Sequence, residues 1–230
     1  MSLRLLALGL LLLAAFPLRS PAQERDENAR ISSYPPIYLG FIRDSMRAFA
    51  ARDFEAAIAL VNKADGTFQV TPVALNVRGA IAIEQRKFAE GRDLCDKALK
   101  LDPTFFPARF NLCEIPFVQG QYPEARRMFE KLLESYPKND LLKFRIYLTH
   151  LLEKNEPVAA EQLEKLPFLS DTPVYYYANA SWAFAHGKNE EAKTWLSRGY
   201  DVFPPARHMN FIDVFYDLGW MPRPGEATGE

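Results

Sequence analysis

The feature that most constrains the fold is one spacing that recurs along the chain. Phe54, Phe88 and Tyr122 are evenly spaced, and Pro103 and Pro137 are separated by the same interval. Each of the three aromatic residues is followed three positions later by a small residue, namely Ala57, Gly91 or Ala125. The interval is about 34 residues, the length of one helical hairpin, and the intervening residues follow a helical apolar pattern. The interval therefore predicts consecutive hairpins that stack because none can bury its apolar face alone.

This pattern resembles the tetratricopeptide repeat, whose period and whose small, aromatic and proline positions it shares. Residues 87–103 and 120–137 carry the likeness most clearly, because they resemble the second helix and the exit of that repeat. The resemblance implies an all-α fold, a right-handed α-solenoid of helical hairpins with a C-terminal capping helix. The expected copies and the cap lie at 38–71, 72–105, 106–139, 140–172, 173–205 and 206–220. The competing interpretation is an irregular helical bundle in which the spacing arises by chance.

Some copies depart from the family pattern. Gly66 and Gln69 stand where the first copy should have its proline exit. In the first helices, Gly79 keeps the usual glycine, whereas the fourth copy has the much larger Tyr147 at that position. Because a large side chain holds two helices apart, we expect the fourth hairpin to splay.

The segment 1–22 is identified as an export signal. Arg4 precedes an unbroken apolar run at 5–16, and the small residues Ser20 and Ala22 suit cleavage after Ala22. A membrane-spanning helix needs about 20 apolar residues, so we expect cleavage and no stable membrane insertion afterwards. The chain would then be exported to the periplasm or secreted. An uncleaved anchor or a short buried helix is the alternative.

Two segments outside the repeats are expected to lack regular structure. Residues 23–37 are largely polar and contain Pro35 and Pro36, which favour a flexible or extended lead-in. The apolar residues in this lead-in suit a position against the first hairpin, or in a groove of the same or a neighbouring molecule. Residues 221–230 should form a loose tail.

Composition and motifs point away from catalysis. The chain has 28 Lys and Arg against 29 Asp and Glu, a balance that disfavours nucleic acid as a partner. Its three histidines do not pair with other ligands at metal-binding spacing, and no nucleophile or phosphate-loop motif occurs. We therefore expect no enzyme activity, no cofactor and no metal. An enzyme would need a site assembled from scattered residues, for which Glu114, between Phe110 and Phe117, is the candidate acid.

The chain contains two cysteines. The resemblance places Cys95 on a second helix and Cys113 on the first helix of the next hairpin, so that both face one interface between repeats. In an oxidising compartment, a disulfide between them is one outcome, and two small buried apolar side chains are the other. The sequence around them lacks the Cys-x-x-Cys motif of thiol catalysis.

In this family the first helices of the hairpins line a groove that binds extended peptides or helices. The resemblance assigns that lining here to Asn76, Phe110, Glu114, Phe117, Phe144, Leu148, Tyr177, Ser181 and Phe184. This set is mostly apolar and lacks the basic and amide residues with which some relatives hold a terminal carboxylate. It favours an apolar peptide or helix as the ligand. The alternative is that these side chains belong to the core of neighbouring hairpins.

The sequence thus predicts a non-enzymatic protein-interaction scaffold or adaptor of the cell envelope or exterior. Its partner would be a protein or peptide, which the sequence does not name. The rival prediction is a structural subunit of an envelope assembly that self-associates through its edges or its capping helix.

Overall fold

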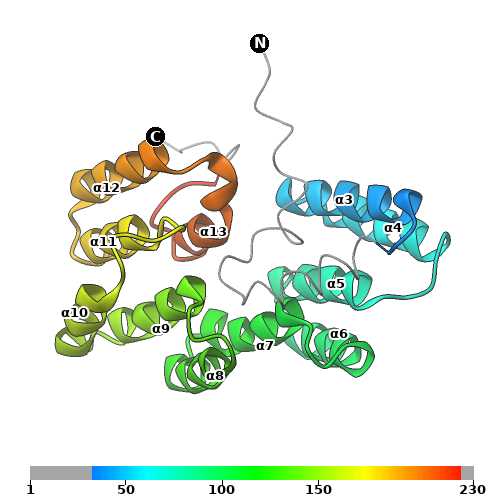
Figure 1. Ribbon diagram of the computed structural model, residues 1–230, viewed down its shortest axis with the longest axis horizontal. Coiled ribbons are helices and arrows are strands. Elements are labelled where there is room, and N and C mark those ends of the chain that lie inside the picture. Colours follow the sequence, from blue (N-terminus) through cyan, green and yellow to red (C-terminus); the bar gives the residue numbers. More distant parts are fainter. Residues whose placement is uncertain (1–32, 224–230) are drawn as a thin grey trace, which may run out of the picture. The chain divides into compact units, whose positions relative to one another are not determined.

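The computed structural model describes residues 33–223, which belong to two compact units at residues 1–119 and 120–230 (Figure 1). Over this described range the regular structure is helical throughout, without a strand, and this confirms the all-α class. The expected signal segment, most of the expected lead-in and residues 224–230 lie outside the described residues.

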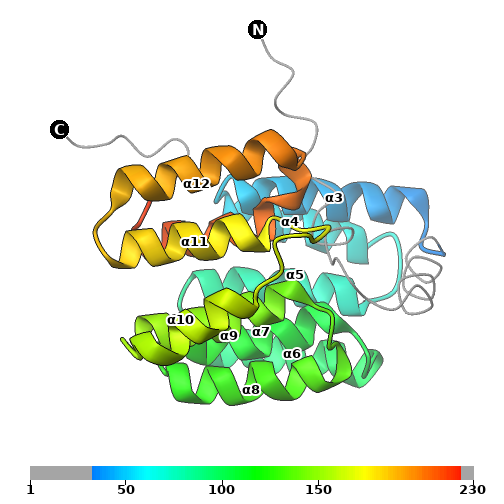
Figure 2. The ribbon, with the colours of Figure 1, turned by 60° about the vertical axis from the view of Figure 1, so that its left-hand side comes forward.

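The described part of unit 1 contains α3 (Pro36–Ala50), α4 (Phe54–Asp65), α5 (Pro72–Glu84), α6 (Phe88–Leu101) and α7 (Phe106–Val118). That of unit 2 contains α8 (Tyr122–Ser135), α9 (Asp140–Leu152), α10 (Glu156–Lys165), α11 (Val174–Ala185), α12 (Asn189–Val202), the 3₁₀ turn η1 (Pro205–Arg207) and α13 (Met209–Asp217). The pairs α3–α4, α5–α6, α9–α10 and α11–α12 each pack as a hairpin (Figures 1 and 2). The turn between α7 and α8 falls at the boundary between the units.

Each hairpin turn contains one residue in the left-handed backbone region at the same register. These residues are Arg52, Arg86, Gly120, Lys154 and Gly187, with φ between 59° and 75°. The residue that follows each of them is the N-cap of the second helix. A left-handed residue reverses the chain at a helix end, which explains why the turn is so short. Glycine suits this position, but three of the five turns use a basic residue instead.

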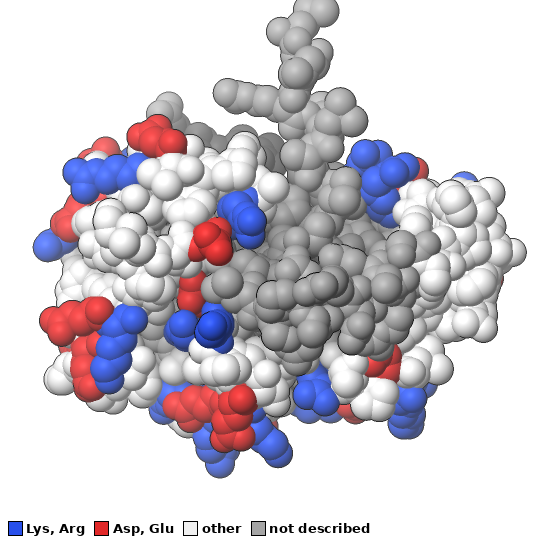
Figure 3. Space-filling model, viewed as in Figure 1, with Lys and Arg blue, Asp and Glu red and all other residues white. Residues whose placement is uncertain are grey.

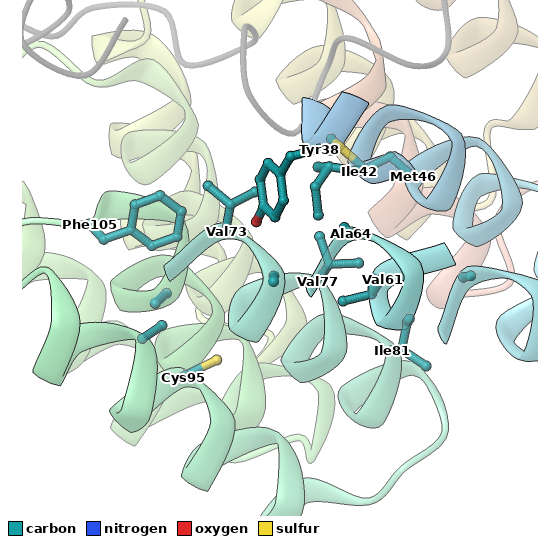
Figure 4. Packing of buried hydrophobic residues seen from close by; sticks show 14 residues of the cluster. Tyr38, Ile42, Met46, Val61, Ala64, Val73, Val77, Ile81, Cys95 and Phe105 are labelled. Atoms are coloured by element: carbon teal, nitrogen blue, oxygen red, sulfur yellow. The ribbon is translucent and has the colours of Figure 1, made fainter. Parts of the chain in front are cut away.

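The core of unit 1 lies between its paired helices, as Figure 4 shows. Tyr38 and Ile42 of α3 face Val61 and Ala64 of α4, and Val77 of α5 lies beneath them, all five being almost completely buried. The Tyr38 hydroxyl forms a hydrogen bond with the Thr71 side chain at the start of α5. Burial raises the pKa of Tyr38 to about 12, so this phenol stays neutral at physiological pH.

Small residues let α5 and α6 approach closely. A Cβ atom added to Gly91 would lie 2.7 Å from Cγ1 of Ile83, and one added to Gly79 would lie 3.0 Å from Sγ of Cys95. At distances this short, an added methyl group would force Ile83 or Cys95 to shift. In the first hairpin the equivalent approach is reinforced by Ser45, whose hydroxyl donates to the Ala57 carbonyl at 2.7 Å.

The fourth hairpin accommodates Tyr147 by directing it toward the next repeat. The Tyr147 side chain is fully buried, and its hydroxyl donates a hydrogen bond to the Ala178 carbonyl of α11 at 3.0 Å. Burial raises the pKa of Tyr147 well above its ordinary value. Helix α10 contacts α9 less extensively than the second helices of the other three hairpins contact their partners, as the expected splay requires, and Tyr147 links its hairpin to the next.

Both ends of the described chain differ from the sequence expectation. Helix α3 begins at Pro36, inside the expected extended lead-in, because proline is well suited to the first turn of a helix. Tyr34, just before it, contacts the rings of Tyr38 and Phe68 in the first hairpin. At the other end, Arg223 of the expected loose tail pairs with Asp217 at the end of α13.

The expected capping helix at 206–220 is shorter in the structure and is preceded by a separate turn. Pro204 lies between α12 and η1, Pro205 begins η1, and α13 then runs only from Met209 to Asp217. Proline lacks the N–H that a continuous helix would use, which explains the interruption. Among the described helices, none has the length and apolar character needed to cross a membrane.

Candidate partner-binding face

The first helices of the hairpins contact one another within each unit. In unit 1, α5 contacts α3 and α7, and in unit 2, α9 contacts α11. The residues expected to line a groove lie on α5, α7, α9 and α11. The structure therefore gathers them on two faces, one in each unit.

In unit 1 the expected lining is partly buried. Asn76 is only 3% exposed, and its side-chain oxygen accepts a hydrogen bond from Nδ2 of Asn111 at 2.9 Å. Phe117 is buried, whereas Phe110 and Glu114 are half-buried. The pairing between α5 and α7 through Asn111 was not predicted, although the two asparagines are separated by close to one repeat length.

In unit 2 the expected lining is covered by α13. The Phe144 ring lies 5.4 Å from that of Phe211, and the Tyr177 ring lies 5.6 Å from Phe211 and 5.4 Å from Phe215. Phe184 contacts Phe215 at 5.7 Å between ring centroids. The expectation of an open groove is therefore corrected for this unit, since these aromatic side chains form its core.

The other two residues expected on this face are also buried. Leu148 is fully buried, and the Ser181 hydroxyl donates to the Tyr177 carbonyl of its own helix at 2.7 Å. Ser181 thus has its hydrogen bond satisfied without a ligand. These residues are buried because α13 packs its apolar side against α9 and α11 and covers them.

Helix α13 is strongly amphipathic. Phe211, Ile212, Val214 and Phe215 are buried, while Asp213 and Asp217 are exposed. Phe211 and Phe215 are four positions apart, so both rings project from one side of the helix toward α9 and α11. Beyond the helix, the Trp220 ring contacts those of Phe184 and Phe215 at 5.8 and 5.3 Å.

A buried histidine joins α13 to the last hairpin. His208, the N-cap residue of α13, is 1% exposed, and its two ring nitrogens lie 3.1 Å from the Tyr177 hydroxyl and 3.1 Å from the Phe203 carbonyl. A carbonyl can only accept, so Nε2 donates to Phe203 and Nδ1 accepts from Tyr177. Burial lowers the pKa of His208, which favours this neutral form.

Aromatic and charged groups surround this histidine. The Tyr200 ring of α12 stacks on His208 at 3.9 Å between centroids. Tyr200, Tyr216 and Asp213 contribute, after burial, to raising the pKa of Tyr177, so the phenol that faces His208 remains a hydrogen-bond donor. No metal or catalytic pattern surrounds His208 in the sequence, and its role was missed there. Its place before an apolar helix was the available signal.

The two cysteines are free thiols in the structure, and the disulfide considered from the sequence is not formed. The Cys113 thiol donates to the Arg109 carbonyl at 3.2 Å, and Cys95 packs at the close approach to Gly79. Burial raises the pKa of each thiol to about 12, so both are protonated and poorly nucleophilic. No group of metal-ligating side chains occurs among residues 33–223.

The charges of the described surface are mixed. On the face shown in Figure 3, Lys and Arg side chains are interspersed with Asp and Glu. Ion pairs such as Arg78–Asp65 and Arg126–Glu153 join charges of opposite sign across helices. On this face the described basic side chains do not form one continuous patch.

Comparison with known proteins agrees with this architecture. Models of the tetratricopeptide repeat match residues 45–104 and 82–145. The chain is 32% identical over 97 residues to small glutamine-rich tetratricopeptide repeat-containing protein 2 of Mycosarcoma maydis, a match that spans 42% of this chain and 28% of that protein. A crystal structure of a tetratricopeptide repeat protein from Parabacteroides merdae superposes with a TM-score of 0.62 at 16% identity, covering 86% of this chain and 77% of that one.

The helical hairpins, the repeat interval and these matches define the class of the protein as an α-solenoid of helical hairpins. Residues 45–145 are matched by the tetratricopeptide-repeat models, so this part of the chain contains tetratricopeptide repeats. Such repeats support a role as a protein-interaction scaffold, and proteins of this family are generally non-catalytic.

Proposed function

We propose that the protein is an exported, non-enzymatic scaffold that binds an apolar helix or peptide of a partner protein through the faces of its first helices. One observation carries the proposal. Phe144, Tyr177 and Phe184 gather on the first helices of unit 2, and the segment that they contact is an amphipathic helix. A face that holds one such helix has the chemistry to recognise another.

The non-enzymatic part of the proposal is supported by the state of the nucleophilic groups. The two thiols are buried and protonated, and the buried histidine has both nitrogens engaged by Tyr177 and Phe203. Glu114 is half-buried on α7 beside the aromatic residues of that helix. A hydrolase-like site would instead need a nucleophile within hydrogen-bond reach of a base.

The proposed export rests on the sequence of the segment 1–22. N-terminal sequencing of the protein recovered from the envelope or the medium tests it directly. We expect the chain to begin at Gln23, because the small residues before it suit signal cleavage. Recovery of a chain that still begins at Met1 would contradict the proposal of cleavage.

The partner-binding part is tested by affinity capture and cross-linking from the native envelope, using the full chain as bait. The variant Phe110→Ala with Glu114→Ala changes the half-buried first-helix face of unit 1, and Arg92→Ala on the exposed side of α6 is the matched control. We expect one protein, cross-linked through an apolar segment, to be retained by the wild type and the control and reduced at least fivefold by the double variant. Equal retention by all three baits would count against the proposed face.

A further inference from the structure

Helix α13 occupies the α9–α11 face in the way that a bound partner helix would. Phe211 and Phe215 insert their rings among Phe144, Tyr177 and Phe184, and all five rings are at least nine-tenths buried. Anchoring through two large apolar residues one turn apart is the usual way for an amphipathic helix to bind a groove. We propose that α13 is an exchangeable intramolecular ligand, which a partner helix with two aromatic residues four positions apart displaces from this face.

The connection of α13 to the repeats favours such an exchange. Helix α13 is only 9 residues long, and Pro204, Pro205 and the 3₁₀ turn separate it from α12. A helix of that length is not stable by itself in water, so it depends on the face that it covers. Its displacement does not require any repeat helix to bend, because the proline-containing connector can absorb the change in direction.

The repeats beneath α13 have links of their own. The Tyr147 hydroxyl of α9 donates to the Ala178 carbonyl of α11, and α11 packs on α12, where Gly199 lies against Tyr176. These contacts do not involve α13. The α9–α11 face therefore keeps its arrangement when α13 leaves, and a second helix can take its place.

His208 makes polar contacts between the start of α13 and the last hairpin. Its two hydrogen bonds, to Tyr177 and to the Phe203 carbonyl, fix the start of α13. Phe211 and Phe215 make the ring contacts with the face, and apolar contacts of this kind recognise shape and spacing and do not require one exact sequence. A foreign helix that matches the positions of Phe211 and Phe215 can therefore substitute for α13.

This inference rests on the proposed function, because it names the partner class of a first-helix face. It adds that the face in unit 2 is occupied in the free protein, so that a partner must compete with α13. The apparent affinity of a partner is then reduced by the fraction of molecules in which α13 is docked. Weakening the docking of α13 should strengthen binding in trans.

The test uses the full chain and a fluorescent peptide with the sequence of residues 205–220. We expect the variant Phe211→Ala with Phe215→Ala to bind this peptide with 1:1 stoichiometry, at least tenfold more tightly than the wild type does. A peptide carrying the same two alanines should bind the variant at least tenfold more weakly. The exposed α12 variant Lys193→Ala with Ser197→Ala serves as the matched control and should behave as the wild type does.

Hydrogen exchange on the wild-type chain provides a second measurement that does not depend on the variant being folded. We expect the amides of residues 211–217 to exchange at least tenfold faster than those in the middle of α9 and α11, because α13 opens separately. Equal protection of the three helices, together with no binding of the peptide by a helical variant, would overturn the inference. A variant that forms a dimer through exchanged α13 helices would overturn the assignment of the face to a foreign helix.

These results can be separated from a failure of the proposed function. Peptide binding in trans requires no envelope partner, so it is observed even if affinity capture finds none. Conversely, a partner captured through the unit 1 face leaves the exchange of α13 to be decided by the peptide and exchange measurements alone.

Discussion

The left-handed residues of the hairpin turns allow the free-energy cost of a positive φ to be measured twice in one protein. One substitution removes this cost at a turn, and another introduces it at the equivalent turn of the next repeat. Lys154 has φ of 59°, is exposed, and occupies the register that Gly187 occupies with φ of 71° one repeat later. We expect Lys154→Gly to stabilise the protein and Gly187→Ala to destabilise it. Lys154→Gly replaces a residue with strained left-handed backbone by glycine, and Gly187→Ala makes the opposite change.

The magnitude follows from two opposing quantities. The left-handed conformation costs an ordinary residue about 1–2 kcal/mol. The extra freedom of glycine in the unfolded chain offsets about 0.4–1 kcal/mol of this. A Cβ atom added to Gly187 meets no atom within 4 Å, so no steric term enters. The net change is therefore about 0.5–1 kcal/mol in each direction, and the two variants should differ by about 1–2 kcal/mol.

Arg86 provides an internal comparison at the same register. Its φ is 61°, but its Nη1 atom also donates to the Val118 carbonyl of α7 at 2.9 Å. Replacement by glycine would relieve the strain and remove a hydrogen bond worth about 0.5–1.5 kcal/mol, so Arg86→Gly should be nearly neutral. The equivalent Arg52 reaches Glu84 at the end of α5 at 2.8 Å, which shows that these arginines link one hairpin to the next.

The assay is urea unfolding monitored by circular dichroism, with the free energy extrapolated to water. The control is Lys188→Gly, whose backbone φ is −89° and therefore carries no left-handed strain. This control should lose about 0.5–1 kcal/mol, because it adds freedom to the unfolded chain and removes only an exposed ion pair with Glu191. If Lys154→Gly proved as destabilising as Lys188→Gly, the strain at the turn would not have the assigned cost and the reasoning would fail.

Three further outcomes follow from the packing. Gly91→Ala should destabilise by about 1–2 kcal/mol because its methyl group would press on Ile83, whereas Gly40→Ala, in open space on α3, should stabilise by about 0.5–1 kcal/mol; thermal unfolding measures both. Tyr147→Phe should cost about 1 kcal/mol in chemical denaturation, since it removes one buried hydrogen bond without leaving a cavity. The depressed pKa of His208 should make stability complete above about pH 6.5 and progressively lower below it, and melting temperatures of His208→Gln should show a shallower acid dependence.

The helical hairpins were predictable because their signal is repeated. The repeat interval placed small residues such as Ala57 and Gly91 where two helices meet, and the structure buries both of them at such contacts. The same register also carries the left-handed turn residues, but the sequence hides this feature when arginine or lysine replaces glycine. A left-handed residue cannot be recognised from the sequence when it is not glycine. At Arg86, the side chain gains a hydrogen bond to the Val118 carbonyl that offsets the backbone strain.

Individual departures from the repeat were harder to interpret. The size of Tyr147 predicted a wider hairpin, and α10 does contact α9 less than the other second helices contact their partners, but the hydrogen bond from Tyr147 to Ala178 of the next repeat was not predicted. Sequence position gives the helix face on which a residue lies, but not whether a long side chain stays within its own hairpin. The hydroxyl of Tyr147 needed a buried acceptor, and a helix carbonyl of the following repeat supplied it.

The position of α13 shows the limit of the groove assignment. An apolar first-helix face has the same composition whether it awaits a partner or is covered by the end of its own chain. The sequence predicted a capping helix at 206–220, but the sequence did not show which surface that helix covers. The polar contacts of His208 with Tyr177 and Phe203 help to fix α13 at the last hairpin, and the bond to Tyr177 joins residues far apart in sequence. An aromatic face near the end of a solenoid therefore indicates the kind of helix that it holds, and the source of that helix has to be established from the packing.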